Sequence, residues 1–320
     1  MQHWHLESKP TQNNLLTPKA LATKIVFTPV RRQFEALACK VWDDLGGRHS
    51  FKMHWDERGV TDELVYQLLK RRSPHIQVFK AISEKTYGHD IDLFIEAKPD
   101  HYIWLCLQAK VMYESPRAVY DAIDHEVYDP EDKSKKIYQW ELLNRHSTDR
   151  IPFYLFYNGF TETSYQSPKG GIRRRVPRRF GCSALFLPHF QHKFLSSPNG
   201  SLTGKKSDVN YKSVNESGTL DAIAWQDLFN IGRLEKLMRY YGLKIKYHSA
   251  KEVVKIDKRD YRKIEFITHY RTEGNDMDFQ ELIPAYYQQE GEVYQPRYSV
   301  YIRRTQEEVR AQRTAPFLAE

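Results

Sequence analysis

The chain has 320 residues, with 49 Lys and Arg against 41 Asp and Glu, which gives a net charge of +8 at pH 7. That length is enough to bury a substantial core, either as one elaborated domain or as a core with a smaller module. The positive balance is compatible with a polyanionic partner but does not require one. No stretch reaches the apolar length of a membrane span or a signal peptide, so we expect no membrane partner.

The first 82 residues are predicted to form an arm, two helices and a strand, in that order. Residues 1–30 show no sustained periodicity and are expected to form an N-terminal arm. Apolar side chains recur at helical spacing over residues 31–47, and Gly46-Gly47 is predicted to end that helix. A second helix is predicted to start at Thr61, followed by a strand over residues 76–82.

The next stretch, YGHDIDLFIEAKPDHYIWLCLQAK, spans residues 87–110 and reads as a β-hairpin. Side chains two apart in a strand point to the same face, so Asp90 and Asp92 share one face of the first strand. A turn at residues 98–100 reverses the chain. In the second strand the apolar residues at 103, 105, 107, 109 and 111 share one face, which leaves Gln108 and Lys110 on the other. Two carboxylates, an amide and an ammonium are therefore expected to meet across the hairpin.

Such a set suits phosphodiester hydrolysis assisted by magnesium. Mg²⁺ takes oxygen ligands and keeps several waters, so one or two carboxylates and a carbonyl oxygen suffice to hold it. An ammonium beside the ion can orient the attacking water or offset charge in the transition state. The alternative interpretation is an ordinary cross-strand salt bridge between Asp90, Asp92 and Lys110 on a solvated sheet face.

The runs Gly88-His89-Asp90 and Gln108-Ala109-Lys110 resemble the PD-(D/E)xK nuclease superfamily, and the Gln-x-Lys form resembles its Mrr-like branch. The resemblance implies a restriction-endonuclease-like core with Mg²⁺ as cofactor, for which Mn²⁺ can substitute. It assigns Asp90, Gln108 and Lys110 as catalytic residues and Asp90 and Gln108 as metal ligands. Asp92, one dipeptide further on, is a less secure metal ligand.

The chain also resembles a sparsely described bacterial family of that superfamily over about residues 31–190. Shared features are an acid before Gly-x-Asp, here Glu84, an aromatic strand ending in Tyr157-Asn158, and a later strand beginning at Gly181. Glu84 is thereby the best third acid of the site. Glu57 and Glu63 are weaker candidates, since the dipole of the second helix is enough to explain Glu63.

A basic segment lies between two predicted core strands. Its glycine entry, Gly170-Gly171, would let it follow a nucleic-acid backbone, and guanidinium groups suit phosphate oxygens. A solvated loop is the alternative. The nucleic-acid-binding candidates are Lys169, Arg173, Arg174, Arg175, Arg178 and Arg179.

The remaining chain divides by composition. Residues 31–195 are predicted as the nuclease-like core, residues 196–220 as a linker or mobile loop, and residues 221–320 as a helical and mixed accessory region. The expected fold class is α/β (α+β), with a mixed central sheet flanked by helices and a C-terminal elaboration. The three cysteines, Cys39, Cys106 and Cys182, have apolar neighbours and form no CxxC pair, which is typical of buried thiols in the reducing cytoplasm.

The cysteines and the absence of a long apolar stretch predict a cytoplasmic protein. The resemblance implies an Mg²⁺-dependent endonuclease acting on DNA, with a role in bacterial defence against foreign DNA. Double-strand cleavage needs two sites, which makes a homodimer a candidate assembly, and a sensor or regulatory protein is a further candidate partner. The alternatives are a catalytically inactive or partner-activated nucleic-acid-binding protein, a nuclease of the same fold acting on RNA, and an interaction protein in a larger complex.

Overall fold

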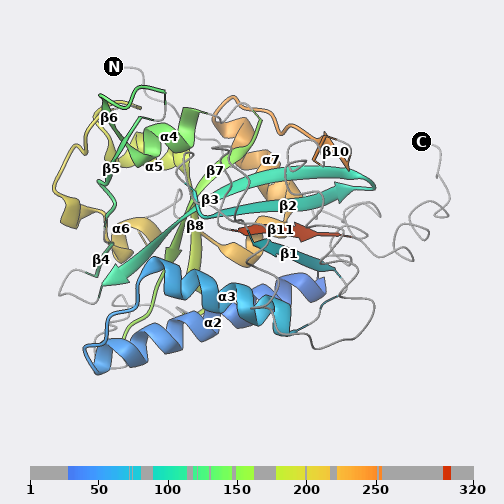
Figure 1. Ribbon diagram of the computed structural model, residues 1–320, viewed down its shortest axis with the longest axis horizontal. Coiled ribbons are helices and arrows are strands. Elements are labelled where there is room, and N and C mark those ends of the chain that lie inside the picture. Colours follow the sequence, from blue (N-terminus) through green and yellow to red (C-terminus); the bar gives the residue numbers. More distant parts are fainter. Residues whose placement is uncertain are drawn as a thin grey trace, which may run out of the picture.

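A mixed central β-sheet flanked by helices forms the fold in the computed structural model (Figure 1). Strand order along the sheet is β1-β11-β2-β3-β7-β8-β9, with β4 and β10 each pairing with β3. This confirms the predicted α+β fold class. The structure describes residues 28–71, 73, 75–80, 89–113, 118–120, 122–129, 131–145, 149–161, 178–198, 200–216, 222–250, 252–253 and 298–303.

The strands of this sheet are β1 Ile76–Lys80, β2 Ile91–Lys98, β3 His101–Tyr113, β4 Val119–Tyr120, β7 Ile151–Tyr157, β8 Cys182–Phe186, β9 Ile223–Ala224, β10 His248–Ser249 and β11 Tyr298–Ile302. Two further strands, β5 Glu126–Tyr128 and β6 Lys136–Tyr138, pair with each other. The helices are α2 Thr28–Ser50, α3 Glu57–Lys70, α4 Gln139–Arg145, α5 Leu187–Phe194, α6 Tyr211–Asn215 and α7 Ile231–Tyr240, with short 3₁₀ turns η1 Arg178–Phe180, η2 Lys206–Asp208 and η3 Trp225–Phe229.

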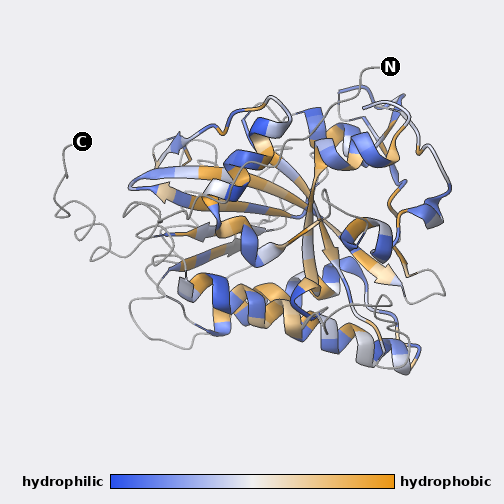
Figure 2. Cartoon of the chain, turned by 180° about the vertical axis from the view of Figure 1, so that it is seen from behind, coloured by the Kyte–Doolittle hydropathy of each residue, from blue (hydrophilic) through white to orange (hydrophobic). Residues whose placement is uncertain are grey.

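The predicted hairpin is present, and its two faces separate as the alternation requires. Strands β2 and β3 are antiparallel with Ile91 opposite Leu107. Their odd-numbered apolar residues join one core cluster with α2 and α3, while Cys106 lies in a second cluster with residues of α4 and α5. Strand β7 then runs parallel to β3, so α4 lies within a crossover between two parallel neighbours. Figure 2 shows the central strands mostly in orange, whereas orange and blue residues alternate along the surrounding helices.

Strand β11 corrects the predicted domain boundaries. It pairs antiparallel with β1 and parallel with β2, so residues 298–302 lie inside the core sheet rather than in an accessory region. All five of its side chains are buried. Strand β9 likewise extends the sheet beside β8. The region 221–320 therefore supplies strands to the core, because a central strand needs backbone partners on both edges and can come from any part of the chain.

The predicted linker over residues 196–220 is also wrong in part, because it contains helix α6. Tyr211 and Val214 of that helix are buried in the second core cluster. The Asn210 side chain accepts a hydrogen bond from the main-chain N–H of Ser213, and the Ser213 hydroxyl closes the reciprocal bond to the Asn210 main chain. Two of the residues that suggested a loop, Asn210 and Ser213, thus cap a helix. Residues 217–221 lie outside the described residues, as do residues 1–27 of the arm predicted over residues 1–30. The last three residues of that arm, 28–30, belong instead to helix α2.

Helix α2 is longer than predicted and runs through Gly46 and Gly47 to Ser50. Gly46 permits a close approach: a Cβ added there would lie 2.2 Å from the main-chain oxygen of Phe160, whereas a Cβ on Gly47 would meet nothing within 4 Å. The glycine pair is therefore not a helix stop. Its first member lets the residues after β7 pack against the helix backbone.

All three cysteines are free thiols, and Cys106 and Cys182 are fully buried while Cys39 is half-buried. Burial raises the pKa of the Cys106 thiol to about 12. Within the part of the chain that the structure describes, none of the helices is long and apolar enough to cross a membrane.

The two glycines of α2 give a matched pair of substitutions. Gly46→Ala is expected to lower the free energy of unfolding by about 1–3 kcal/mol, because the new methyl group collides with main-chain atoms that cannot rotate away. Gly47→Ala is expected to raise it by about 0.5–1 kcal/mol, through the better helix propensity of alanine. Urea unfolding of both variants measures the difference, and equal effects would contradict the packing role of Gly46.

Candidate active site beside the start of strand β2

The candidate site lies where β3 runs on past the beginning of β2. Strand β2 starts at Ile91, opposite Leu107, whereas β3 continues to Tyr113. Strand β7 covers the other edge of β3 as far as Val111. Among the described residues, therefore, β3 has a strand neighbour on one edge only from Gln108 to Val111, and Asp90, the residue just before β2, lies where the pairing with β2 ends.

Asp90 is fixed by main-chain hydrogen bonds. Its N–H donates to the Leu107 carbonyl over 2.8 Å, and its own carbonyl accepts from the Tyr298 N–H of β11 over 3.1 Å. One carboxylate oxygen, Oδ2, accepts the Ala109 N–H over 2.7 Å. The carboxylate thus takes the place of the missing strand rung, and charge-assisted bonds of this kind are stronger than neutral ones.

The Gln108 side chain lies beside this carboxylate. Its amide nitrogen donates to Asp90 Oδ2 over 2.7 Å and to its neighbour Ala109's carbonyl over 3.2 Å. Among the described residues its amide oxygen accepts no hydrogen bond, although the residue is only 3 % exposed. The amide nitrogen is therefore held by its neighbours, and the amide oxygen remains available as a ligand.

Lys110 is the next side chain on the same face of β3. It is 2 % exposed, and its ammonium lies 3.5 Å from Glu57 Oε1 at the start of α3. An ammonium taken out of water is costly unless an opposite charge compensates it. Glu57 is that countercharge.

Glu57 reaches this position because α3 begins four residues earlier than the predicted start at Thr61. Asp56 is the N-cap, and its side chain accepts the Gly59 N–H over 2.7 Å. An Asp three residues before Gly59 is a readable capping signal, and weighting it would have placed Glu57 in the first helical turn. Glu63 lies elsewhere: its carboxylate accepts from Gln67 and lies 3.5 Å from Lys40. Glu84, the expected third acid, lies outside the described residues.

Two buried tyrosines of β7 lie close enough to Glu57 or Asp90 to be affected by the charge of these acids. The Tyr157 hydroxyl is 2.9 Å from Thr61 Oγ1 on α3. Burial raises the pKa of Tyr157 well above the usual value, and the nearby charges of Asp90 and Glu57 add to that rise. Burial and then Glu57 raise the pKa of Tyr154 in the same direction.

Asp92 has different contacts from those expected of a metal ligand. Its Oδ1 atom accepts from the Trp104 indole over 2.6 Å and lies 2.9 Å from His89 Nε2, and the residue is 5 % exposed. Within the described structure it contacts neither Gln108 nor Lys110. Instead, the contact between His89 and Asp92 connects the residues before and after Asp90 and so stabilises the start of β2.

The donors at this site suit Mg²⁺. A carboxylate from Asp90 and an amide oxygen from Gln108 are the hard oxygen ligands that the ion prefers, and waters complete its octahedron. Among the described residues, no three His, Cys, Asp or Glu side chains cluster closely enough to hold a metal. A resident ion here would therefore depend on the amide, on water and on a substrate oxygen.

Two members of the predicted basic cluster are described, and both contact acids of the protein. Arg178 forms an ion pair with Asp43 of α2. Arg179 lies 3.7 Å from Asp227. These pairs hold η1 against α2 and η3. Lys169, Arg173, Arg174 and Arg175 lie outside the described residues.

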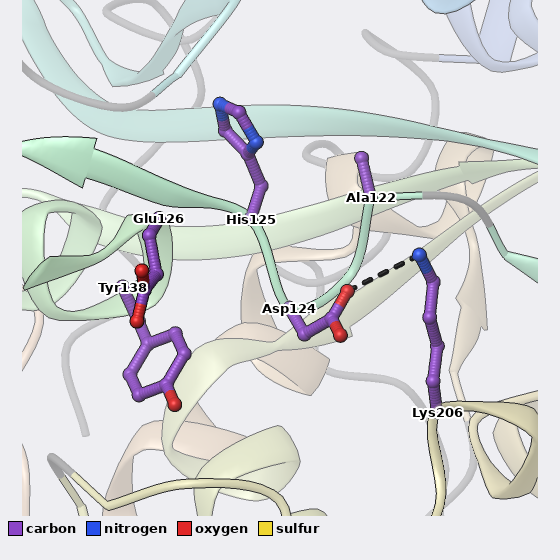
Figure 3. A pocket seen from close by; sticks show the side chains of 6 residues that line it. All are labelled: Ala122, Asp124, His125, Glu126, Tyr138 and Lys206. Carbon is purple, nitrogen blue, oxygen red and sulfur yellow. Dashed lines mark ion pairs between the residues drawn. The ribbon is translucent and has the colours of Figure 1, made fainter.

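A surface pocket lies apart from these residues (Figure 3). It is lined by side chains of the turn after β4, of β5 and β6, and of η2, and Lys206 forms an ion pair with Asp124 over 3.2 Å across it. None of the candidate catalytic residues contributes to its lining. Its lining residues are Ala122, Asp124, His125, Glu126, Tyr138 and Lys206.

The Lys110–Glu57 pair can be tested through stability. Lys110→Met is expected to change the free energy of unfolding by no more than about 2 kcal/mol, because the removal of a buried charge is offset by the loss of the ion pair with Glu57, whose side chain is 26 % exposed and can be hydrated. Glu57→Gln is expected to lower it by about 1–3 kcal/mol, because Lys110 loses its countercharge. Urea unfolding measures both effects.

Lys40→Met is the matched control. Lys40 is paired with Asp44 but its side chain is 36 % exposed, so its removal should change the free energy of unfolding by less than about 1 kcal/mol. If Lys110→Met destabilised the protein by several kcal/mol, the ammonium would be part of what holds the fold together.

The comparisons with known proteins give one match. A model of DUF6615, described as a family of unknown function, matches residues 30–316. No curated protein and no solved structure matches the chain. The matched region contains every described residue of the candidate site and also β11 near its end. The chain belongs to the DUF6615 family of unknown function.

Proposed function

We propose that the protein is a metal-dependent endonuclease that hydrolyses phosphodiester bonds in DNA. The observation that carries the proposal is that Asp90, Gln108 and the buried Lys110 lie together on the stretch of β3 beyond its pairing with β2. An ordinary salt bridge on a solvated sheet face would leave these side chains exposed, and Gln108 and Lys110 are not exposed. Ionisable groups that are buried beside a specific charge partner are candidates for functional sites.

Each residue has a distinct role in this proposal. Asp90 and the Gln108 amide oxygen hold Mg²⁺ or Mn²⁺, which would polarise the scissile phosphate and lower the pKa of a bound water. Lys110 orients the attacking water and offsets negative charge on the phosphate in the transition state. Glu57 holds the ammonium in place, and Glu84 stays a candidate for a further acid.

The arrangement of elements supports a restriction-endonuclease-like core. An antiparallel hairpin carries the acid and the Gln-x-Lys, and a crossover containing α4 leads to a parallel strand beside it. The proposal extends to a cytoplasmic role in defence against foreign DNA, to the basic segment around Arg173 as a backbone contact, and to a homodimer and a sensor or regulatory protein as partners.

Cleavage of supercoiled plasmid with Mg²⁺ or Mn²⁺ tests the activity. We expect nicking or linearisation that EDTA abolishes, and Lys110→Met is expected to slow it at least about 100-fold, because one electrostatic stabiliser of the transition state is lost. Gln108→Ala should raise the concentration of metal ion that cleavage requires. Gel electrophoresis of time courses measures the rates.

Lys133→Ala is the matched control, since Lys133 is an exposed lysine and should leave the rate unchanged. Cleavage of RNA but not DNA would redirect the proposal to a ribonuclease. Metal-independent binding with no cleavage of either polymer would instead identify an inactive or partner-activated nucleic-acid-binding protein.

A further inference from the structure

The turn between α2 and α3 displays two large apolar side chains. Phe51 is 78 % exposed and Met53 is 53 % exposed, with the exposed Lys52 between them. Single exposed apolar residues are common, but two neighbours on one turn form a surface feature. We call residues 51–53 the FKM turn.

The FKM turn has an ordered backbone. The N–H groups of Phe51 and Met53 both donate to the Arg48 carbonyl, over 3.1 and 2.9 Å, and the Lys52 N–H donates to His49 over 2.9 Å. Lys52 has a φ of 57°, the left-handed conformation that a lysine adopts only when its surroundings impose it. The backbone therefore presents Phe51 and Met53 to solvent as a fixed edge.

Two contacts tie this edge to the candidate active site. His54 Nε2 lies 3.1 Å from the Tyr113 hydroxyl at the end of β3, and the two rings stack with centroids 5.1 Å apart. Glu57 then contacts Lys110, three residues before Tyr113 on the same strand. Figure 1 shows the connection from α2 to α3 at the end of the molecule where β3 ends.

Three basic residues, Arg48, Lys52 and Arg58, lie in or around the turn. Arg48 packs over the Trp55 ring at 4.3 Å and Arg58 is exposed, while Lys52 forms no ion pair within the described residues. Of the two nearby acids, Glu57 is paired with Lys110, and Asp56 caps α3 and keeps its negative charge, which leaves the basic residues in excess around the turn. An anionic ligand that approaches the site along this edge therefore meets positive charge and an exposed aromatic ring together.

We propose that the FKM turn binds an unpaired nucleic-acid strand beside the catalytic residues, with Phe51 stacked on a base and Lys52 on the adjacent phosphate. The inference rests on the proposed function, from which it takes nucleic acid as the ligand. Bases of an intact duplex are stacked on one another and offer no face to Phe51, whereas unpaired bases stack readily on aromatic side chains. The substrate class is thus single-stranded or locally unpaired DNA, such as a flap, a bubble or a frayed end.

Fluorescence anisotropy with labelled 20-nucleotide single strands and the matched duplex, in EDTA, tests the inference without cleavage. Phe51→Ala is expected to weaken single-strand binding about tenfold and to leave duplex binding unchanged. Lys52→Ala should lower the slope of log affinity against log salt concentration by about 0.7, as for one lost contact to a single-strand phosphate. Tyr240→Ala removes an aromatic ring of similar exposure on α7 and should change neither value.

The outcomes separate this inference from the nuclease proposal. Selective loss of single-strand binding in Phe51→Ala upholds the inference even if wild-type protein cleaves nothing, which would sink only the nuclease proposal. Cleavage that depends on Lys110, with single-strand affinity unchanged in Phe51→Ala, would overturn the inference alone. A change from dimer to monomer in Phe51→Ala by sedimentation, with unchanged affinity, would also overturn it and identify the turn as a contact between copies.

Discussion

The buried ammonium of Lys110 imposes a constraint on which the arrangement of the site depends. Because it is excluded from water, a carboxylate must come to it, and that carboxylate is the first helical residue of α3. The pair therefore fixes one end of a surface helix against a central strand. The same requirement places the turn before α3, with its exposed Phe51, at the end of β3.

The local sequence pattern was sufficient to predict much of the core. Alternation over residues 91–111 predicted which side chains of the hairpin face each core cluster, and helical spacing predicted α2, because both signals follow from backbone geometry alone. The pairing of Asp90 with Gln108 followed from the same reasoning. Alternation also placed Asp92 on the face of Asp90, yet neighbouring donors on Trp104 and His89 decide what that carboxylate does.

Other parts depend on contacts between distant residues and could not be predicted in this way. Five residues, Tyr298–Ile302, become a central strand only because β1 and β2 leave a space between them. Helix α6 is short and polar in composition, and burial of Tyr211 against the second core cluster stabilises it. Glu57 is a site residue because of where α3 begins, and a short capping sequence such as Asp56 to Gly59 is a weaker signal than periodicity.

Strand β11 also sets the order in which the site can be assembled during synthesis. Asp90 receives its last main-chain hydrogen bond from Tyr298, and β2 has no neighbour on that edge until β11 is available. Pairings between residues so far apart in sequence form late, because closing the intervening loop costs entropy first. A nascent chain on the ribosome would therefore hold the Asp90 carboxylate in an incomplete sheet. The complete arrangement would arise only after residues 298–302 had emerged.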